Sequence, residues 1–253
     1  MQFIFYKGYE SYQPAFEQIV NNFTTQGIII GDPNRNTVKA FEVNGAKFNF
    51  KSFKIPNLIN KIAYRHFRKS KARRSFEYAC QLLDKGIGTP QPIAYLERTD
   101  AVGLTSSFYV SEHLENIFTL RDVISDPAFI DREQIIRLYT AFFFKMHEQH
   151  IFFKDNSPGN VLIEKEEAAY KLFLVDLNRM DTNREMSMQE RLGNFCRLTD
   201  DHAVLNVIAD EYAKLATISP TVAYNLIIAS TEAFLKKAAS KRRLKKALRL
   251  SKK

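Results

Sequence analysis

The feature that most constrains this chain is the segment FKDNSPGN at residues 153–160, followed by an apolar run at residues 172–175 and then Asp176. An Asp, an Asn five residues later and a second Asp after an apolar run are the side chains that phosphoryl transfer from a nucleotide requires. One carboxylate aligns the attacking hydroxyl, while an amide oxygen and another carboxylate hold Mg²⁺ against the phosphates. The pattern therefore predicts Asp155 as the base and Asn160 and Asp176 as metal ligands.

The residues around this pattern predict a hairpin. Pro158-Gly159 is typical of a tight turn, and residues 161–163 and 172–175 are short apolar runs typical of buried strands. Asn160 lies near one end of this pair and Asp176 near the other, and such a hairpin can bring both metal ligands to one side. A polar turn before an unrelated strand has the same spacing, so the prediction depends on these surroundings.

Length and cysteine content limit the class of protein. A chain of 253 residues can form one bilobed domain or two small domains. It opens without the apolar core of a secretory signal and has no run of about 18 apolar residues that would span a bilayer. Its two cysteines, Cys80 and Cys196, lack CxxC spacing, which argues against a disulfide framework or a zinc site. We therefore expect a protein of the reducing cytoplasm.

The net charge of +9 is concentrated at the C-terminal end. Residues 236–253, the basic tail, contain seven Lys, three Arg and no acidic residue, and the rest of the chain has 27 basic and 28 acidic residues. A second acid-free cluster comprises Lys61, Arg65, Arg68, Lys69, Lys71, Arg73 and Arg74. Both patches suit an anionic partner, either a phosphorylated glycolipid, a membrane surface or a nucleic acid, but solvated helix faces have the same composition.

The first half of the chain predicts a small sheet. Five segments have the apolar or alternating composition of strands: residues 27–30, 37–43, 46–53, 93–96 and 108–111. Asn44-Gly45 is a strong hairpin signal because both residues tolerate positive φ.

Within the third of these strands, Phe48 and Phe50 share one face, so Lys51 is directed to the other face. Lys51 is the candidate for a cation at the nucleotide phosphates, although a lone strand lysine is more often a solvated residue. Lys54 is the competing candidate, but it lies on the opposite face and close to Pro56.

A helix is predicted over residues 70–85, closed by Gly86. Glu77 lies at the border of its apolar stripe. A carboxylate at that place can reach the third strand and pair with Lys51, which would hold the ammonium at the phosphates.

The second half is predicted to be helical apart from the hairpin. Residues 131–134 resemble a capping box at the start of a helix, and residues 187–215 also have a helical pattern. Ser219 at a cap and Pro220 at the first helical position predict a last long helix. We divide the chain into an N-terminal nucleotide-binding lobe, a C-terminal catalytic helical lobe and the basic tail: residues 1–111, 112–235 and 236–253.

In this order, the predicted elements resemble an α+β, bilobed protein-kinase-like fold, with an N-terminal five-stranded antiparallel sheet, one helix and a C-terminal helical lobe. The motifs are more closely similar to those of the lipopolysaccharide kinase family. They are KSFK (51–54), RKSKA (68–72), GIGTPQPIAY (86–95), DNSPGN (155–160) and DLNRM (176–180). The resemblance covers roughly residues 25–215, and DNSPGN with DLNR is its most specific part. This family phosphorylates Kdo or heptose in the inner core of bacterial lipopolysaccharide, using ATP and Mg²⁺.

The resemblance implies a role for each candidate residue. Asp155 would be the catalytic base that orients the sugar hydroxyl, and Asn160 and Asp176 would bind Mg²⁺. Lys51 would contact the α- and β-phosphates, and Glu77 would fix Lys51. The backbone of Glu112 and Leu114 would meet the adenine edge.

Several motif residues differ from those of eukaryotic-type protein kinases, and these differences argue against a peptide substrate. Phe153 stands where those kinases have His, Leu177-Asn178 replaces Phe-Gly, and no Ala-Pro-Glu segment follows. A peptide-docking activation segment is therefore not expected. The loop at residues 31–36 has a single Gly, so phosphate contacts there would come from its backbone or from a side chain such as Arg35.

The leading hypothesis is an ATP- and Mg²⁺-dependent kinase of the lipopolysaccharide core or a lipid A-linked glycolipid. It would be peripheral on the inner face of the inner membrane, held electrostatically by the basic tail. The alternatives are a kinase of a soluble small molecule or of protein, and a non-catalytic nucleotide-binding scaffold. A nucleic-acid partner is not expected, because the sequence has neither an RNP-like aromatic pattern nor zinc spacing.

Overall fold

The computed structural model describes residues 1–30, 36–53, 69–167 and 169–250. These residues form two compact units, and each is described by itself. The first unit comprises Met1–Asn116 and Phe173–Asn178, and the second comprises Ile117–Leu172 and the chain from Arg179 onward. The predicted lobe boundary at residue 111 therefore differs from the observed division at Asn116. The short segment that carries Asp176 belongs to the first unit.

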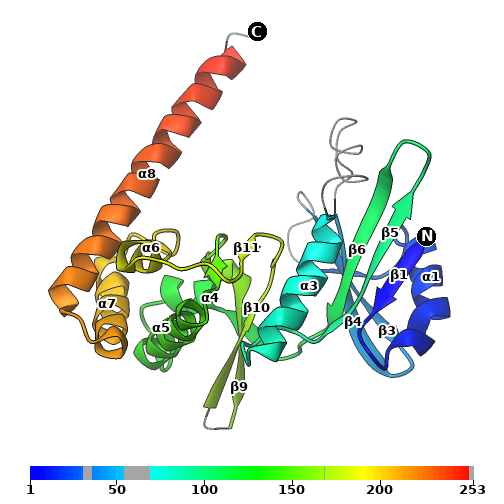
Figure 1. Cartoon of the computed structure of the whole chain (residues 1–253), viewed down its shortest axis with the longest axis horizontal. Coiled ribbons are helices and arrows are strands. Elements are labelled where there is room, and N and C mark those ends of the chain that lie inside the picture. Colours follow the sequence, from blue (N-terminus) through cyan, green and yellow to red (C-terminus); the bar gives the residue numbers. More distant parts are fainter. Residues whose placement is uncertain (31–35, 54–68, 168, 251–253) are drawn as a thin grey trace. The chain divides into compact units, whose positions relative to one another are not determined.

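The first unit is built on a six-stranded antiparallel sheet with the strand order β1-β5-β6-β4-β3-β2 (Figure 1). Its strands are β1 (Gln2–Phe5), β2 (Ile28–Ile30), β3 (Thr37–Val43), β4 (Ala46–Ser52), β5 (Pro92–Thr99) and β6 (Leu104–Glu112). The five predicted strands are confirmed, but the sheet has a sixth. The additional strand, β1, pairs with β5 at the edge of the sheet and comes from residues to which the sequence assigned no structure.

The predicted hairpin between β3 and β4 is confirmed. Asn44 and Gly45 have φ angles of 53° and 78°, and Val43 pairs with Ala46 across the turn. Two successive positive φ angles define a type I′ turn, whose twist matches that of the flanking strands. This turn fixes the register of β4 and therefore the face on which Lys51 lies.

One face of the sheet packs against α1 (Gln13–Asn21). Phe16 is fully buried, and its ring centroid lies 5.3 Å from that of Phe48 and 4.9 Å from that of Phe50. Edge-to-face aromatic contacts of this kind add to the free energy gained from apolar burial. In the part of the N-terminal unit that the structure describes, α1 accompanies the predicted helix α3.

The other face of the sheet packs against α3 (Lys71–Asp84). Ser70 caps this helix by accepting a hydrogen bond from Arg73 N at 3.0 Å, and Gly86 ends it with a φ of 63°. Phe76 packs on Tyr95, with ring centroids 5.4 Å apart. Because side chains alternate along a strand, the buried Phe50 faces α1 while Lys51 is on the α3 side.

A buried lysine fixes the chain between α1 and β2. Lys39 on β3 is only 6% exposed, and its Nζ donates to the carbonyls of Phe23 at 2.6 Å and Gln26 at 2.7 Å. The ammonium also lies 5.1 Å from the ring centroid of Phe23. The three interactions offset the cost of removing a charge from water.

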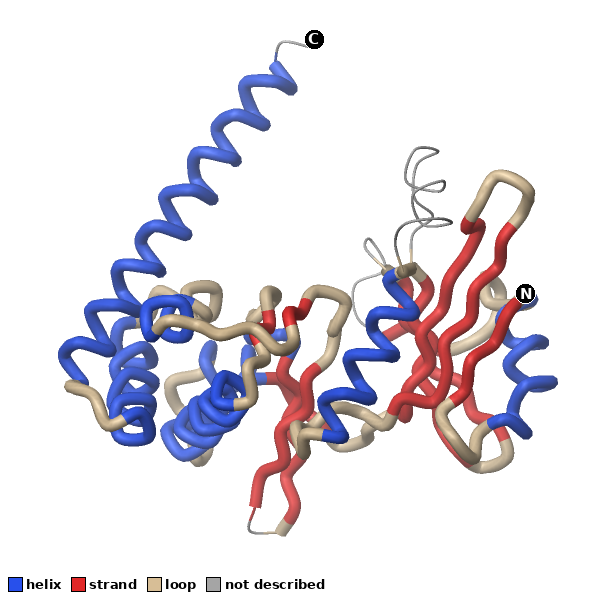
Figure 2. Tube along the Cα trace, in the orientation of Figure 1, coloured by secondary structure: helices blue, strands red, loops and turns tan. Residues whose placement is uncertain are grey.

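Helices predominate in the second unit (Figure 2). They are α4 (Leu120–Ser125), α5 (Arg132–Glu148), α6 (Met188–Gly193), α7 (His202–Ala216) and α8 (Pro220–Leu250). The predicted hairpin is present as β9 (Val161–Glu166) and β10 (Ala169–Leu174), and β7 (Ile117–Thr119) extends it to three strands. A separate two-stranded sheet joins β8 (Phe152–Phe153) to β11 (Met180–Asp181).

The capping box predicted at residues 131–134 is wrong. Asp131 precedes α5 but has a φ of 59°, and its carboxylate accepts a hydrogen bond from Tyr170 Oη at 2.7 Å instead of capping the helix. A capping residue needs an extended backbone to direct its side chain at the helix N-terminus, and the left-handed conformation prevents this. Capping boxes occur at Thr119 before α4 and at Ser187 before α6.

The predicted start of the last helix at Pro220 is confirmed, and α8 continues without a break to Leu250 (Figure 1). Its first turns bury Ala223 and Ile227, and α8 contacts α6 and α7. The basic tail therefore continues an already packed helix. No helix in the described part of the chain is long and apolar enough to cross a membrane.

Candidate active site

The first unit brings Lys51 and Asp176 together. Lys51 Nζ lies 2.7 Å from Asp176 Oδ1, and their side chains are 17% and 30% exposed. The ammonium also lies 5.6 Å from the ring centroid of Phe53. Partial burial strengthens this ion pair compared with an exposed one, because water screens the two charges less. Lys54, the competing candidate, lies outside the described residues, as does Arg35.

The end of β10 positions Asp176. Leu174 N donates to the Gly88 carbonyl at 2.9 Å, and Thr89 Oγ1 donates to the Leu174 carbonyl at 2.8 Å. Asp176 itself has a φ of 60°, which turns the chain sharply after the strand. The buried Asn178 donates from Nδ2 to Asp176 Oδ1 at 2.7 Å, so this oxygen accepts two hydrogen bonds.

Glu77 does not form the predicted pair with Lys51. Its carboxylate binds Lys69 Nζ at 2.7 Å and Arg73 Nε at 2.9 Å. Burial would raise the pKa of Glu77, but the hydrogen bonds from these two cations outweigh burial and hold the pKa below its usual value. Arg73 lies one turn before Glu77 on the same helix, so this pair needs less side-chain ordering than a pair reaching across to the sheet. Glu77 lies on α3, which packs on the face of the sheet that carries Lys51, but the two side chains have different partners.

Glu112 ends β6 at the predicted adenine-binding segment. Its N–H donates to the Gln91 carbonyl at 2.9 Å, and the following residue, His113, donates from its N–H to the Lys47 carbonyl at 3.0 Å. The N–H of Glu112 is therefore used within the sheet, and its carbonyl, which accepts from Ser111 Oγ at 3.3 Å, has a second lone pair that can accept from a ligand. Leu114 follows outside the strand and is half-buried.

The second unit holds Asp155 and Asn160. Asp155 follows β8, and Asn160 ends the short 3₁₀ helix Pro158–Asn160. Asn160 Nδ2 donates to the Asp155 carbonyl at 2.9 Å, which leaves Oδ1 of the amide as the atom that can bind a metal. Asp155 is 19% exposed, and its Oδ1 lies 2.7 Å from Arg197 NH1.

Gly159 lies beside the guanidinium of Arg121, an exposed side chain. A Cβ on this glycine would lie 2.7 Å from Arg121 NH2, within contact distance. The sequence predicted a tight turn at Pro158-Gly159, and the turn is present as 3₁₀ helix. Gly159 does not have a positive φ, and the nearest atoms to an added Cβ belong to the flexible end of Arg121, which could move aside.

A buried polar network supports the loop that carries Asp155. Asn156 is fully buried; its Oδ1 accepts from Tyr139 Oη at 2.8 Å and its Nδ2 donates to the Asn194 carbonyl at 3.1 Å. Asn194 Nδ2 in turn donates to the Phe153 carbonyl at 2.9 Å. The residues on both sides of Asp155 are thereby tied to α5 and to the segment after α6.

His147 completes this network. Its Nε2 lies 3.2 Å from Asn194 Oδ1 and its Nδ1 lies 3.0 Å from Tyr212 Oη. Because Asn194 Oδ1 is an acceptor, Nε2 carries the proton and Nδ1 accepts from the tyrosine. Burial lowers the pKa of His147 to about 4, against a smaller raising effect of the hydrogen bond to Asn194. The imidazole is therefore neutral and structural at pH 7.

Sequence reasoning missed Arg197, Asn178 and this network. Asn156 and Asn178 lie inside the two quoted motifs, so their positions were visible although their contacts were not. Arg197 and Asn194 lie far from the motifs and have no sequence signal, because their contacts depend on how the chain returns after α6.

Each unit, taken by itself, offers an oxygen donor of the kind that a magnesium ion prefers. Asn160 offers an amide oxygen, and Asp176 has a second carboxylate oxygen, Oδ2, that takes no hydrogen bond from the described residues. Mg²⁺ is commonly held by one or two protein oxygens together with substrate phosphates and water. Among the described residues no group of three or more His, Cys, Asp or Glu side chains forms a metal cluster, so a protein-only metal cage is not seen there.

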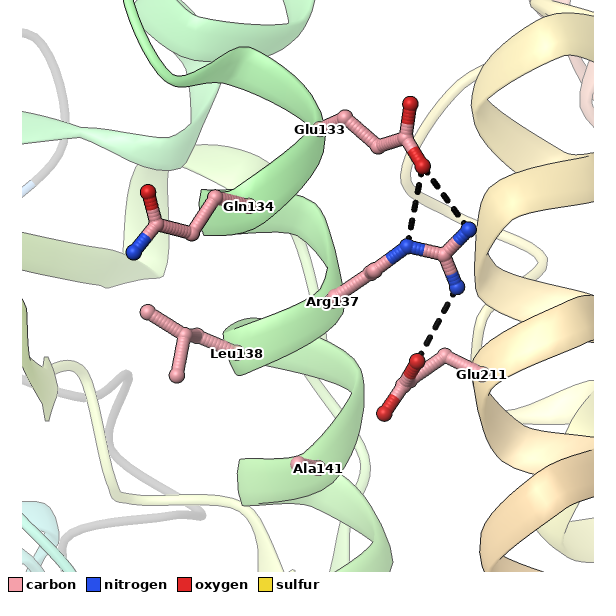
Figure 3. Close-up of a pocket in the computed structure, with 6 residues that line it drawn as sticks. All are labelled: Glu133, Gln134, Arg137, Leu138, Ala141 and Glu211. Atoms are coloured by element: carbon pink, nitrogen blue, oxygen red, sulfur yellow. Dashed lines mark hydrogen bonds and ion pairs between the residues drawn. The ribbon is translucent and has the colours of Figure 1, made fainter.

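A surface groove of about 400 Å³ lies elsewhere, between α5 and α7. In Figure 3, Glu133 on α5 and Glu211 on α7 both reach Arg137. Asp210 also binds Arg137, at 2.6 Å, so three carboxylates satisfy this guanidinium. None of the site residues predicted from the sequence lines the groove.

Comparison with known proteins places these residues in a family. The profile of the lipopolysaccharide kinase (Kdo/WaaP) family matches residues 21–215. A search of curated proteins found no matching sequence. Among solved structures, WaaP in complex with acyl carrier protein is similar over 95% of this chain and 99% of that chain, with a TM-score of 0.64 and 16% identity.

A second solved structure is the Rio2 kinase–ADP/Mg²⁺–phosphoaspartate complex from Chaetomium thermophilum, which is similar over 87% of this chain and 69% of that chain, with a TM-score of 0.48 and 12% identity. The predicted α+β, protein-kinase-like fold is confirmed, with the extra strand and helix described above. The family profile covers most of the chain, including every candidate residue. The chain therefore belongs to the lipopolysaccharide kinase (Kdo/WaaP) family.

Proposed function

We propose that this protein transfers the γ-phosphate of ATP to a sugar hydroxyl, Kdo or heptose, in the inner core of lipopolysaccharide. The observation that carries the proposal is the family match over residues 21–215, which includes the partly buried Lys51–Asp176 pair and the Asp155–Asn160 loop. These are the groups that phosphoryl transfer needs: a base, two oxygen ligands and a cation.

In the proposed reaction the sugar oxygen attacks the γ-phosphorus, and the bond from that phosphorus to the β,γ-bridging oxygen breaks. Asp155 orients the hydroxyl and accepts its proton, so the products are a sugar phosphate and ADP. A sugar hydroxyl is a weak nucleophile near neutral pH, and most of the acceleration would come from alignment and charge neutralisation.

The remaining residues bind the nucleotide in this proposal. Asn160 and Asp176 hold Mg²⁺, which neutralises charge on the phosphates when bound. Lys51 contacts the α- and β-phosphates, and the backbone of Glu112 and Leu114 meets the adenine edge. Glu77, whose carboxylate binds Lys69 and Arg73, has no role at Lys51 in this scheme.

The acceptor is tested in cells and in vitro. Mass spectrometry of the lipopolysaccharide core from cells with and without the gene should show the loss of one phosphate. Purified protein with γ-labelled ATP should label core lipopolysaccharide from the deletion strain. Labelling of a free sugar or of protein alone would favour the soluble-acceptor alternative, and nucleotide binding without transfer to any acceptor would favour the scaffold.

We also propose that the basic tail holds the protein at an anionic membrane or at lipopolysaccharide itself. Six cations on the described part of the tail are exposed: Lys236, Lys237, Lys241, Arg242, Arg243 and Lys245. Each cation near an anionic surface contributes about 1 kcal/mol to adsorption. Lys61, Arg65 and Arg68 of the second basic cluster lie outside the described residues.

A further inference from the structure

Arg197 contacts the proposed base directly. Its NH1 lies 2.7 Å from Asp155 Oδ1 and 3.1 Å from the Lys154 carbonyl. The side chains of Arg197 and Asp155 are 35% and 19% exposed. One guanidinium nitrogen thus bridges the carboxylate of Asp155 and the backbone of the residue before it.

A ring on α8 supports the same guanidinium. The central carbon of the Arg197 guanidinium lies 5.8 Å from the ring centroid of Phe234, which is half-buried. A planar cation over an aromatic face is held by electrostatic attraction to the ring and by dispersion. Arg197 is therefore restrained both by the Asp155 loop and by α8.

The segment that carries Arg197 is itself attached to the loop. Asn194, three residues earlier, donates to the Phe153 carbonyl at 2.9 Å and accepts at its own carbonyl from Asn156 at 3.1 Å. Contacts from residues 194–197 therefore flank Asp155 on both sides. Only the contact from Arg197 reaches the Asp155 carboxylate itself.

We propose that Arg197 is a positioning residue that selects the rotamer of Asp155, with Phe234 holding the guanidinium in place. The inference rests on the proposed role of Asp155 as the base. Because Oδ1 is bound to Arg197, Oδ2 is the oxygen left to accept from the acceptor hydroxyl in this scheme. A carboxylate fixed in this way contributes to rate through alignment, since a base that rotates away from the hydroxyl leaves fewer complexes in a reactive geometry.

The test compares Arg197→Ala, Arg197→Lys and Phe234→Leu with wild type, using γ-labelled ATP and core lipopolysaccharide purified from the deletion strain. Arg197→Ala should lower kcat about tenfold while both KM values stay within about twofold, because alignment affects the chemical step. Arg197→Lys should recover part of kcat, since an ammonium can donate to one carboxylate oxygen. Phe234→Leu keeps apolar volume but removes the ring face, and should lower kcat by about two- to fivefold.

Lys214→Ala is the control for losing a basic residue from an ion pair, because Lys214 is 58% exposed and its partner is Asp210. Its kinetics should match those of wild type. Thermal unfolding of every variant separates a loss of folded protein from a loss of rate. If the fall in kcat of Arg197→Ala disappears once activity is normalised to the folded fraction, the positioning role is overturned.

A double-mutant cycle with Asp155→Asn separates this inference from the proposed function. If Arg197 acts only through Asp155, Arg197→Ala should have no further effect in the Asp155→Asn background. If instead Arg197→Ala lowers kcat by the same factor in the Asp155→Asn background as in wild type, the positioning role is overturned. A higher KM for lipopolysaccharide with kcat unchanged would also overturn it and would show instead that Arg197 binds an anionic group of the acceptor. Full activity of Asp155→Asn alone would refute the base itself, a result distinct from either failure at Arg197.

Discussion

Lys51 and Asp176 are 125 residues apart in the sequence and form an ion pair with a nitrogen–oxygen distance of 2.7 Å. β4 supplies the lysine, and the end of β10 supplies the aspartate. Asn178 donates to the same carboxylate oxygen at 2.7 Å. The pair places a proposed phosphate-binding cation beside a proposed metal ligand within one unit.

Asp176→Asn should weaken Mg²⁺-dependent binding of ATP more than Asp155→Ala does. The substitution removes a charged oxygen ligand from a hard cation that prefers carboxylates, whereas Asp155 acts on the acceptor. Calorimetry of Mg²⁺-ATP with both variants makes the comparison. Equal affinities for wild type and Asp176→Asn would remove this residue from the metal site.

Asp155→Ala should lower turnover by about 10²- to 10⁴-fold with near-normal nucleotide binding, because the carboxylate acts on the acceptor hydroxyl. Initial rates with labelled ATP and core lipopolysaccharide measure this. Asp210→Ala is a matched control, since Asp210 is an ion-paired aspartate whose partners are Arg137 and Lys214. Retention of more than about half of the activity by Asp155→Ala would contradict the assignment.

Deleting the basic tail should weaken binding to anionic vesicles while sparing turnover on a short soluble core acceptor. The deleted residues carry ten positive charges and none of the proposed catalytic groups. Binding should also weaken with salt, because the Debye length falls from about 10 Å at 0.1 M to about 3 Å at 1 M. Co-sedimentation with vesicles of rising anionic lipid content and rising salt measures both effects.

A full-length variant with glutamine at the exposed tail cations separates charge from helix length. The substituted residues are Lys236, Lys237, Lys241, Arg242, Arg243 and Lys245. This variant keeps four of the ten tail cations, so its vesicle binding should lie between that of wild type and that of the truncated protein. If either variant binds vesicles as tightly as wild type, or if vesicle binding does not change with salt, the tail is only a solvated helix end. Membrane binding would then be assigned to the basic cluster at residues 61–74.

Stability should fall as the pH is lowered from about 6.5 toward 4, partly because of His147. In the folded protein burial lowers its pKa to about 4, from an ordinary value of 6.5. Between these values the unfolded chain binds a proton that the folded protein does not, so protonation favours unfolding. The difference corresponds to roughly 3 kcal/mol once both values have been passed.

His147→Gln tests this, since an amide can donate to Asn194 and accept from Tyr212 without titrating. Denaturant unfolding at several pH values should show a flatter dependence for the variant between pH 6.5 and 4.5, a range above the ordinary pKa values of Asp and Glu. Identical slopes in wild type and variant would mean that His147 does not contribute to acid sensitivity.

Local sequence signals fixed much of the N-terminal sheet. Asn44 and Gly45 supply the two positive φ angles of the hairpin turn, and the alternation of Phe48 and Phe50 with Lys51 assigns the faces of β4. Ser70 and Gly86 delimit α3 in the same way. These features depend on backbone preference and on a period of two or 3.6 residues, which a short stretch of sequence contains in full.

Other local signals were misleading because a tertiary contact outweighed them. Residues 131–134 have the composition of a capping box, but Asp131 bonds to Tyr170 on β10 and has a left-handed backbone. The sequence of β1 has no strong strand pattern of its own. It forms a strand because its backbone pairs with β5. In both cases the partner that decides the structure is distant in sequence.

The sequence by itself determined which residues are the candidates for chemistry: Asp155, Asn160 and Asp176 follow from their residue types and spacing, and Lys51 follows from strand phase. Only the tertiary structure decided their partners, pairing Lys51 with Asp176, Glu77 with Arg73 and Lys69, and Asp155 with Arg197. The physical reason is that an ion pair forms with the nearest opposite charge that can be reached at small cost in side-chain order. That distance is set by the packing of strands and helices, which no local sequence pattern contains.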